Sequence, residues 1–217
     1  MIIKIANVKK SIKGKTVLDK INFEFISGNK YAIVGHNGSG KTMFLKLLSG
    51  LILPTEGKIF IDNKEMHKDF RFYDSQGLII ETTRFYPNLT GFENLKLLAS
   101  IKKKISDDDI KEVLEKVNLT SSINLKVNKY SLGMNQRLAI AQAIMEDPDI
   151  LLLDEPTIAL DDNSRDIFFG ILDEFKMKNK IIVVATNEIH DLNKRYDKFI
   201  KINNGEITKS GETYEYE

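Results

Sequence analysis

The chain has 217 residues, of which 42% are hydrophobic, so it can bury one sizeable core and a single globular domain is predicted. The 32 Lys and Arg residues nearly balance the 31 Asp and Glu residues, and the net charge of +1 gives no overall field that would attract nucleic acid or an anionic membrane. The chain has no cysteine, which excludes disulfides, cysteine nucleophiles and cysteine-ligated metal sites.

The amino-terminal residues lack the apolar run of a secretion signal, and no segment has the length and apolarity of a membrane-spanning helix. We therefore expect a protein that is not secreted. If it works at a membrane, it does so from one side.

The first half of the chain predicts a hairpin followed by a strand, a loop and a helix. Apolar residues over 2–8 and 17–25 predict two β-segments, joined by a turn at 13–15. A compact apolar strand at 31–34 leads into a glycine-rich loop, and residues 41–48 carry apolar side chains at helical spacing. An antiparallel hairpin should therefore precede a strand, loop and helix unit.

A helical subdomain is predicted over about 90–146, because this stretch shows no strand pattern and contains helix starts. Thr90 and Glu93 form a capping box, and Ser106 precedes three aspartates, which suit the positive end of a helix. Lysines 102–104 beside these aspartates are interpreted as a solvated helix junction rather than a docking patch. The α/β core would then comprise about 1–89 and 147–210, and the tail after Gly211 is expected to fray.

Two later apolar runs, at 150–153 and 181–185, lack polar alternation, which is typical of strands buried on both faces of a parallel sheet. Between them, residues 167–175 form an amphipathic pattern of helical period. Together they predict a βαβ unit in a doubly covered sheet.

The glycine-rich loop matches the pattern G-x-x-x-x-G-K-[ST] and has the context that this motif requires, between a buried strand and a helix. Its backbone N–H groups can surround phosphates, and the helix terminus adds partial positive charge. Lys41 can reach β- and γ-phosphate oxygens, and the Thr42 hydroxyl can bind Mg²⁺. A nucleoside triphosphate site is predicted. Its residues are Gly35, His36, Asn37, Gly38, Ser39, Gly40, Lys41 and Thr42.

The strand at 150–153 runs into two carboxylates, Asp154 and Glu155, at the edge of the sheet where ligands of α/β proteins bind. Successive strand residues point to opposite faces, so the two are expected to have different roles. Asp154 would hold Mg²⁺ through its water shell, and Glu155 would polarise the attacking water. Acids at a strand end often only meet solvent, but their pairing with the phosphate loop favours catalysis.

Residues 130–137, Tyr-Ser-Leu-Gly-Met-Asn-Gln-Arg, resemble the signature motif of ATP-binding cassette (ABC) ATPases, and residues 159–161 resemble the D-loop of that family. The resemblance runs from the opening hairpin to about Gly205. Residues 81–95 and the Ser-Leu-Gly-Met sequence are similar to bacitracin- and lantibiotic-type exporter ATPases. The resemblance implies the α/β P-loop NTPase fold of ABC ATPases, with a parallel core sheet, an antiparallel β subdomain and an inserted α-helical subdomain.

The resemblance also implies that two cassettes, identical or related, enclose ATP, with Ser131 and Gly133 of one facing the nucleotide on the other. Glu81 falls where the family has a glutamine that contacts Mg²⁺ and the attacking water, and its charge would bind the metal more strongly. Asn187 falls at the family histidine that contacts the γ-phosphate, and it would donate a hydrogen bond without charge assistance. Ile12 replaces an aromatic that stacks on adenine, so modest base discrimination is expected.

Two side-chain questions stay open at the level of sequence. His190, close to Asn187, could substitute for the family histidine or be a surface residue. Phe85 and Tyr86 could face a membrane partner or pack in the core.

The leading interpretation is the ATP-binding and ATP-hydrolysing subunit of an ABC transporter. It would be cytoplasmic and peripheral on the cytoplasmic face of the cell membrane, where it would use Mg²⁺ and power export, of a peptide or antibiotic for example, through separate transmembrane permease subunits. The catalytic residues would be Glu155, Lys41 and Asn187.

The alternative is a regulatory or assembly subunit of a membrane complex that binds ATP with little hydrolysis, which the departures at Ile12, Glu81 and Asn187 suggest. ABC ATPases of DNA repair or translation would need insertions or a second cassette for which the chain has no room. With no basic patch either, no nucleic-acid partner is expected. Small-molecule P-loop kinases have no use for the signature-like segment.

Overall fold

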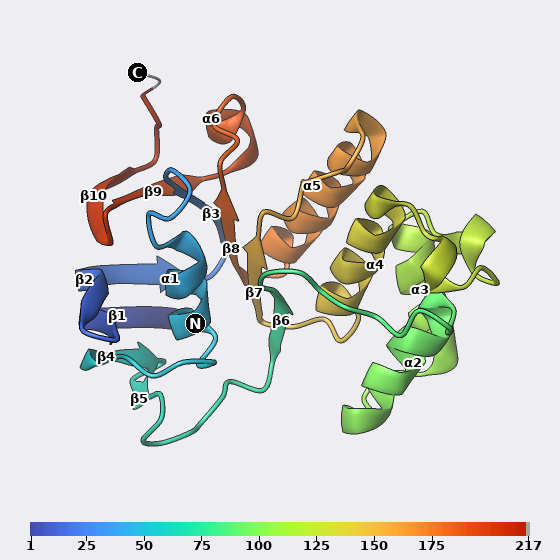
Figure 1. Ribbon diagram of the computed structural model, residues 1–217, viewed down its shortest axis with the longest axis horizontal. Coiled ribbons are helices and arrows are strands. Elements are labelled where there is room, and N and C mark those ends of the chain that lie inside the picture. The colour runs from blue at the N-terminus through green and yellow to red at the C-terminus, as the bar shows by residue number, and fades with distance from the viewer. Residues whose placement is uncertain (216–217) are drawn as a thin grey trace.

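The computed structural model describes residues 1–215 and contains two β-sheets and a lobe of helices (Figure 1). The first sheet is antiparallel, with strand order β2-β1-β4-β5. The predicted hairpin is confirmed, since Ile3 pairs with Phe25 and Ile5 with Phe23. Its strands are β1 (Ile2–Ile12), β2 (Lys15–Ile26), β4 (Glu56–Ile61) and β5 (Lys64–Glu65).

The second sheet has six strands in the order β10-β9-β3-β8-β7-β6, all parallel except the edge strand β10. The three strands predicted for this sheet are confirmed. Sequence analysis identified no strand after residue 186, yet β9 and β10 follow, and β9 pairs in parallel with β3. The strands are β3 (Asn29–Val34), β6 (Gln76–Ile79), β7 (Ile150–Asp154), β8 (Ile181–Thr186), β9 (Lys198–Asn203) and β10 (Glu206–Gly211).

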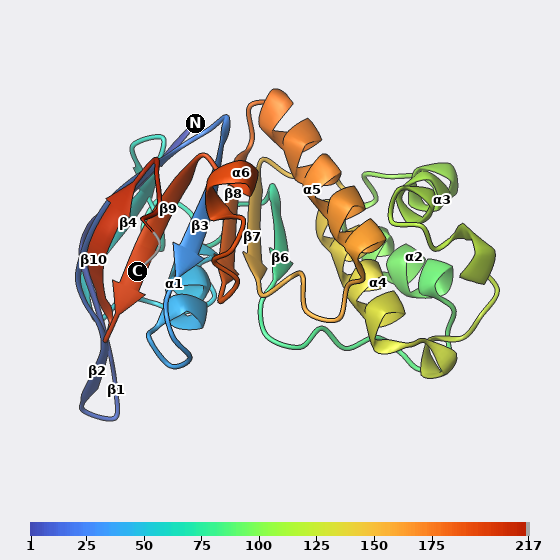
Figure 2. The same cartoon turned by 90° about the horizontal axis from the view of Figure 1, so that it is seen from above.

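Both faces of β7 and β8 are buried, because successive side chains enter different cores. Leu152 and Val183 pack with helix α1 (Lys41–Leu48) and with the antiparallel sheet. Leu151 and Ile182 point the other way and pack with helix α5 (Asp162–Met177). Figure 2 shows the result, with the parallel strands between the antiparallel sheet at one end and the helices at the other. The predicted βαβ unit is confirmed as β7, α5 and β8.

Residues 91–144 form the helical lobe in the segment where the helical subdomain was predicted. The capping box at Thr90 is present, since its hydroxyl accepts from Glu93 N and its N–H donates to the Glu93 carboxylate at 2.7 Å. Ser106 and Asp109 form a second capping box. The elements are α2 (Gly91–Lys102), α3 (Asp107–Lys116), α4 (Leu132–Ile144) and the 3-10 turns Thr120–Ser122 and Val127–Lys129.

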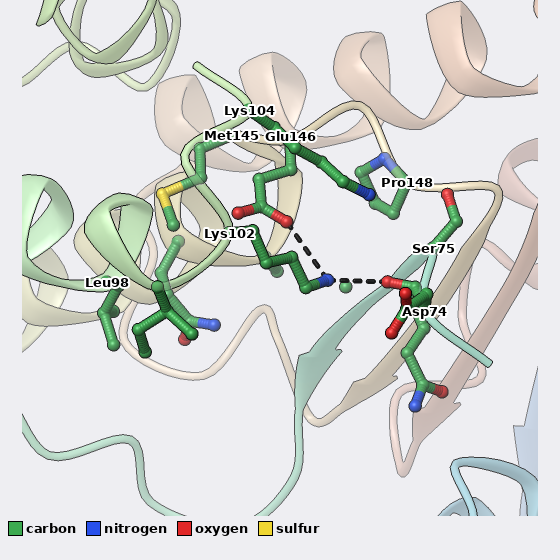
Figure 3. Close-up of a pocket in the computed structure, with 13 residues that line it drawn as sticks. Asp74, Ser75, Leu98, Lys102, Lys104, Met145, Glu146 and Pro148 are labelled. Atoms are coloured by element: carbon green, nitrogen blue, oxygen red, sulfur yellow. Dashed lines mark hydrogen bonds and ion pairs between the residues drawn. The ribbon is translucent and has the colours of Figure 1, made fainter. Parts of the chain in front are cut away.

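The lysine run at 102–104 is exposed in the link from α2 to α3, as expected of a solvated junction. Lys102 also reaches back to the core, where its ammonium donates to the carbonyl of Asp74 at 2.6 Å and pairs with Glu146 at 3.2 Å. These contacts border a shallow hollow of about 170 Å³ between α2, α4 and the start of β6 (Figure 3). Lys102 therefore ties the lobe to the sheet.

The expectation that the tail after Gly211 frays is wrong for the residues that the structure describes. Tyr214 is buried, and its ring packs against the Phe199 ring in a T-shaped arrangement with the two centroids 5.0 Å apart. Its backbone exchanges two hydrogen bonds with the Asn193 amide, at 2.7 and 3.0 Å. Aromatic burial and a paired amide offset the entropy of ordering the segment. Residues 216 and 217, also included in that expectation, lie outside the described residues.

Helix α4 approaches the sheet closely because β6 has a glycine at the contact. A Cβ atom on Gly77 would lie 1.9 Å from the carbonyl oxygen of Ala143, a distance that the backbone of α4 would have to relieve by moving. Gly170, on the exposed side of α5, has nothing within 4 Å of an added Cβ. A close contact between helix and sheet therefore requires glycine at position 77, whereas no contact requires it at position 170.

We expect Gly77→Ala to lower the free energy of unfolding by about 2–3 kcal/mol, because it forces α4 away from the sheet. Gly170→Ala is the matched control and should raise it by up to about 1 kcal/mol, because alanine is the better helix former. Urea denaturation measures both. Equal effects of the two changes would refute the assigned close contact.

Candidate functional site

Three parallel strands deliver the predicted residues to one edge of the sheet. Strand β8 lies between β3 and β7, so the chain segments that leave Val34, Asp154 and Thr186 are neighbours. The loop over 35–40 turns from β3 into α1 through Gly38 (φ 81°) and Gly40 (φ 114°), two left-handed conformations that favour glycine. Sequence spacing alone could not have brought 35–42, 154–155 and 187 together.

Lys41 lies at the centre of this edge and is almost buried. Its ammonium donates to the Gly35 carbonyl and to Asn187 Oδ1, each at 2.6 Å, and lies 3.9 Å from Glu155 Oε1. Burial lowers the pKa of Lys41, and the charges of Glu155 and Asp154 oppose that shift. The ammonium is thus surrounded by protein oxygen atoms. Phosphate oxygens could take the place of these acceptors.

Thr42 and Asp154 are joined by a hydrogen bond of 2.6 Å from the hydroxyl to Oδ2. Burial raises the pKa of the Asp154 carboxyl, while the Thr42 bond acts in the opposite direction. A hydroxyl and a carboxylate at this spacing are the hard oxygen ligands that Mg²⁺ uses together with phosphates and water. The two side chains therefore fit the predicted magnesium site. Among residues 1–215, no three His, Asp or Glu side chains are grouped to hold a metal ion.

Glu155 does not follow the strand alternation used to predict it. Strand β7 ends at Asp154, and Glu155 takes a left-handed conformation (φ 48°). Both carboxylates consequently border the same hollow instead of opposite faces of the sheet. Glu155 Oε2 accepts from the backbone N–H of Asn187 at 3.2 Å, and burial raises the pKa of its carboxyl.

These groups border an open hollow of about 510 Å³. Within residues 1–215, no aromatic side chain lines it. Ile12, expected to contact the nucleotide base, is 41% exposed at the end of β1 and does not border the hollow. Val17, from the other strand of the hairpin, does border it and was not identified from sequence. The lining residues are Val17, Asn37, Gly38, Gly40, Lys41, Thr42, Met43, Lys46, Glu81, Asp154, Glu155, Ile158 and Asn187.

Glu81 borders the hollow, and its carboxylate pairs with Lys46 of α1 at 2.5 Å. Sequence analysis did not single out Lys46, since a basic residue in the second turn of a helix carries no signal of its own. The Lys46 ammonium therefore offsets the negative charge of Glu81, at the position where the family resemblance implies a glutamine.

Asn187 bridges two parts of the site, because its Nδ2 donates to Asn37 Oδ1 at 2.8 Å while its Oδ1 accepts from Lys41. His190 is exposed and borders a separate hollow with Arg165 and Arg195. Asn187, not His190, therefore occupies the position beside Lys41.

Ser131 caps helix α4, with its hydroxyl accepting from Met134 N at 3.2 Å. Neither it nor Gly133 borders the hollow around Lys41. A Cβ on Gly133 would lie 2.8 Å from the Ala159 carbonyl, and Gln136 donates to the Pro156 carbonyl at 2.8 Å. The start of α4 is thus tied to the segment after Glu155. Leu132, between Ser131 and Gly133, borders a second hollow together with Thr42 and Glu155.

His36 extends the phosphate loop toward the β9–β10 turn. Its Nε2 lies 3.0 Å from Asn203 Oδ1, and its Nδ1 lies 2.9 Å from the Asn37 carbonyl. Of the eight predicted loop residues, five border the hollow, and Gly35 contributes its carbonyl to Lys41.

Comparisons with known proteins agree with this geometry. The family model described as ABC transporter matches residues 18–158. An uncharacterised ABC transporter ATP-binding protein of Bacillus subtilis, YybJ, is 46% identical over 208 residues, which cover 96% of this chain and 95% of that protein. The bacitracin transport ATP-binding protein BcrA of Enterococcus faecalis is 33% identical, covering 95% and 76%, and the lantibiotic transport ATP-binding protein SrtF of Streptococcus pyogenes is 34% identical, covering 88% and 82%.

Solved structures give the same result. The dimeric bacterial ABC transporter cassette MJ0796 superposes with a TM-score of 0.86 at 27% identity, over 99% of this chain and all of that one. A post-hydrolysis state of the same cassette, bound to ADP and phosphate, gives 0.87. The chain therefore belongs to the ABC transporter family as an ATP-binding cassette, the subunit type that binds ATP with Mg²⁺ and hydrolyses it.

Proposed function

We propose that this chain powers an exporter of peptide- or antibiotic-like substrates by hydrolysing ATP on the cytoplasmic face of a membrane, beside separate permease subunits. The observation that carries the ATPase assignment is the convergence of Lys41, the Thr42 and Asp154 pair and Glu155 on one hollow. The relatives named for bacitracin and lantibiotic transport support export. Within residues 1–215, no helix is both long enough and apolar enough to cross a bilayer.

In this proposal the triphosphate enters along the loop at 35–42. Its β- and γ-phosphate oxygens replace the Gly35 carbonyl and Asn187 Oδ1 as partners of the Lys41 ammonium. Thr42 and Asp154 would hold Mg²⁺, which would supply positive charge to offset the charge that develops on the phosphates. Burial lowers the pKa of Lys41, and the nearby charges of Glu155 and Asp154 oppose that shift and so favour the cationic form.

Glu155 is the proposed general base. It takes a proton from the water that attacks the γ-phosphorus, so that the bond to the bridging oxygen breaks and ADP and phosphate are formed. Burial raises the pKa of Glu155, which makes it a better proton acceptor than an exposed glutamate. Asn187 would then donate its amide N–H to the γ-phosphate.

A second cassette would complete the site. Ser131 and Gly133 lie outside their own chain's hollow, at the start of a 13-residue helix whose free N–H groups suit an anion. Leu132 between them is 71% exposed. The dimeric state of the MJ0796 cassette supports a sandwich in which this helix end meets the partner's nucleotide.

We also propose that residues 90–146 move as a unit against the core formed by 1–89 and 147–210. The segment that leads into this unit carries Phe85, which packs in the core, and Tyr86, which is 63% exposed. Tyr86 is therefore the aromatic of the pair that is placed to contact a permease. Movement of the unit during ATP turnover would reach the membrane subunits through it.

Glu155→Gln should lower the rate of phosphate release by at least about 100-fold, because an amide cannot accept the proton. ATP binding should remain and ATP-bound dimers should accumulate, measured by light scattering with Mg·ATP. Glu24→Gln, on the surface of β2, is the control and should turn over normally. Unchanged turnover in the Glu155 variant would remove its assignment as the base.

The pH dependence of kcat/KM should reflect the raised pKa of Glu155. A base works only when deprotonated, so kcat/KM should be full above its pKa and fall as the pH drops through it. Because burial raises that pKa above the ordinary 4.5, the acid limb should lie above pH 4.5. Steady-state rates with folding monitored by circular dichroism test this, and a flat profile down to pH 4.5 would contradict it.

ATP and GTP should bind with Kd values within about tenfold of each other, a difference of about 1.4 kcal/mol. The reason is that none of the aromatic rings in the described part of the chain borders the hollow to stack on the base, so phosphate contacts carry the affinity. Equilibrium dialysis with Mg²⁺ measures both. A strong preference for ATP would show that a residue outside the hollow recognises adenine.

The regulatory alternative predicts a different rate of phosphate release. It is motivated by Asn187, which is uncharged at a position where a cation would assist phosphate transfer. A purified chain that binds Mg·ATP yet releases no phosphate, even with its membrane partners present, would favour a nucleotide switch. Turnover on the ordinary enzyme scale of about 1–10 per second would eliminate it.

A further inference from the structure

Beside the ATP site, one ion pair joins two segments that carry catalytic groups. Glu188 follows Asn187 directly, and both oxygens of its carboxylate face the Arg165 guanidinium: Nη1 donates to Oε1 at 3.2 Å, and Nη2 donates to Oε2. The buried hydroxyl of Thr157 donates to the same Oε2 at 3.3 Å. Three donors thus converge on one carboxylate.

These donors come from the segment that begins at Glu155. Thr157 lies two residues beyond Glu155, and Arg165 lies in the first turns of α5, which Asp161 caps by accepting from Ser164 N at 2.8 Å. Glu188 comes from the segment after β8. The carboxylate therefore connects the part of the chain that carries the base with the part that carries Asn187.

Asn187 needs such a support, because residues 187–191 belong to no helix or strand. Its side chain lies between Lys41 and Asn37, with Oδ1 2.6 Å from the Lys41 ammonium and Nδ2 2.8 Å from Asn37, and its N–H donates to Glu155. The same position would let its amide reach a γ-phosphate that displaces Oδ1 from Lys41. A guanidinium and a carboxylate that meet through two parallel bonds fix orientation as well as distance. Displacement of a positioned group by about 1 Å can cost about 100-fold in rate.

We propose that Arg165 and Glu188 are positioning residues for ATP hydrolysis, which hold Asn187 and Glu155 in register across the nucleotide. This inference rests on the proposed ATPase function. Neither residue borders the hollow around Lys41, so the pair acts through its neighbours and not on ATP itself.

The chain contains a matched control. Asp166, the next residue of α5, pairs with Arg195 at 2.7 Å, and Arg195 lies in the short helix α6 (Leu192–Arg195). This pair also links α5 to the segment after β8, but it contacts neither Asn187 nor Glu155. A role in general stability would affect both pairs, whereas positioning requires only the first.

The experiment compares Glu188→Gln, Arg165→Lys and the double variant with Asp166→Asn, measuring kcat, the Kd of Mg·ATP and Tm. We expect kcat to fall about 10-fold or more for Glu188→Gln and Arg165→Lys, with the Kd within about twofold of wild type, because the phosphate loop is untouched. The double variant should lose no more than the worse single variant, since each residue acts through the other. Asp166→Asn should keep the wild-type kcat.

Unchanged kcat in Glu188→Gln, an equal loss in Asp166→Asn, or additive losses in the double variant would each overturn the inference while leaving the ATPase function intact. A loss that merely follows Tm would also overturn it, and assays at about 20 °C below the lowest Tm separate the two effects. No turnover in the wild-type protein would instead refute the proposed function, and the inference with it.

Discussion

The contact on which the site depends is the placement of one ammonium among oxygen atoms at the edge of a parallel sheet. Lys41 is held by the Gly35 carbonyl and by Asn187 Oδ1, with Glu155 3.9 Å away. A buried cation is stable only when such acceptors surround it. The same acceptors are weaker partners than a triphosphate would be, so phosphate oxygens could take their place around the ammonium.

The order of the strands creates this contact. Because β8 lies between β3 and β7, the loop after β3, the two acids after β7 and the asparagine after β8 leave the sheet side by side. Buried faces on β7 and β8 fix the sheet between two cores, so the strand ends keep their order at this edge. The close contact at Gly77 then sets α4 against the sheet, and Gly133 and Gln136 set the start of α4 against the segment after Glu155.

The two positions at which the sequence analysis expected departures from the family pattern, Glu81 and Asn187, both have local partners in this chain. The charge of Glu81 is paired with Lys46, and the uncharged Asn187 is linked to Asn37 and Lys41 at the same time. The pair of Arg165 and Glu188 lies directly behind Asn187, where it can restrict the motion of a segment without regular structure. A neutral amide donates a weaker hydrogen bond than a cation does. A site that uses an amide therefore depends more on the precise position of that side chain.

Sequence alone determined the hairpin, the glycine-rich loop between strand and helix, the capping box at Thr90 and the two buried strands, since each is encoded by local pattern and turn chemistry. It also placed Asp154 and Glu155 at the sheet edge. It could not predict β9 beside β3, the left-handed turn at Glu155, the burial of Tyr214, or the partners Lys46, Arg165 and Glu188. Those features depend on which strands become neighbours and on which distant side chains then meet, and both are set by packing of the whole chain rather than by any local segment.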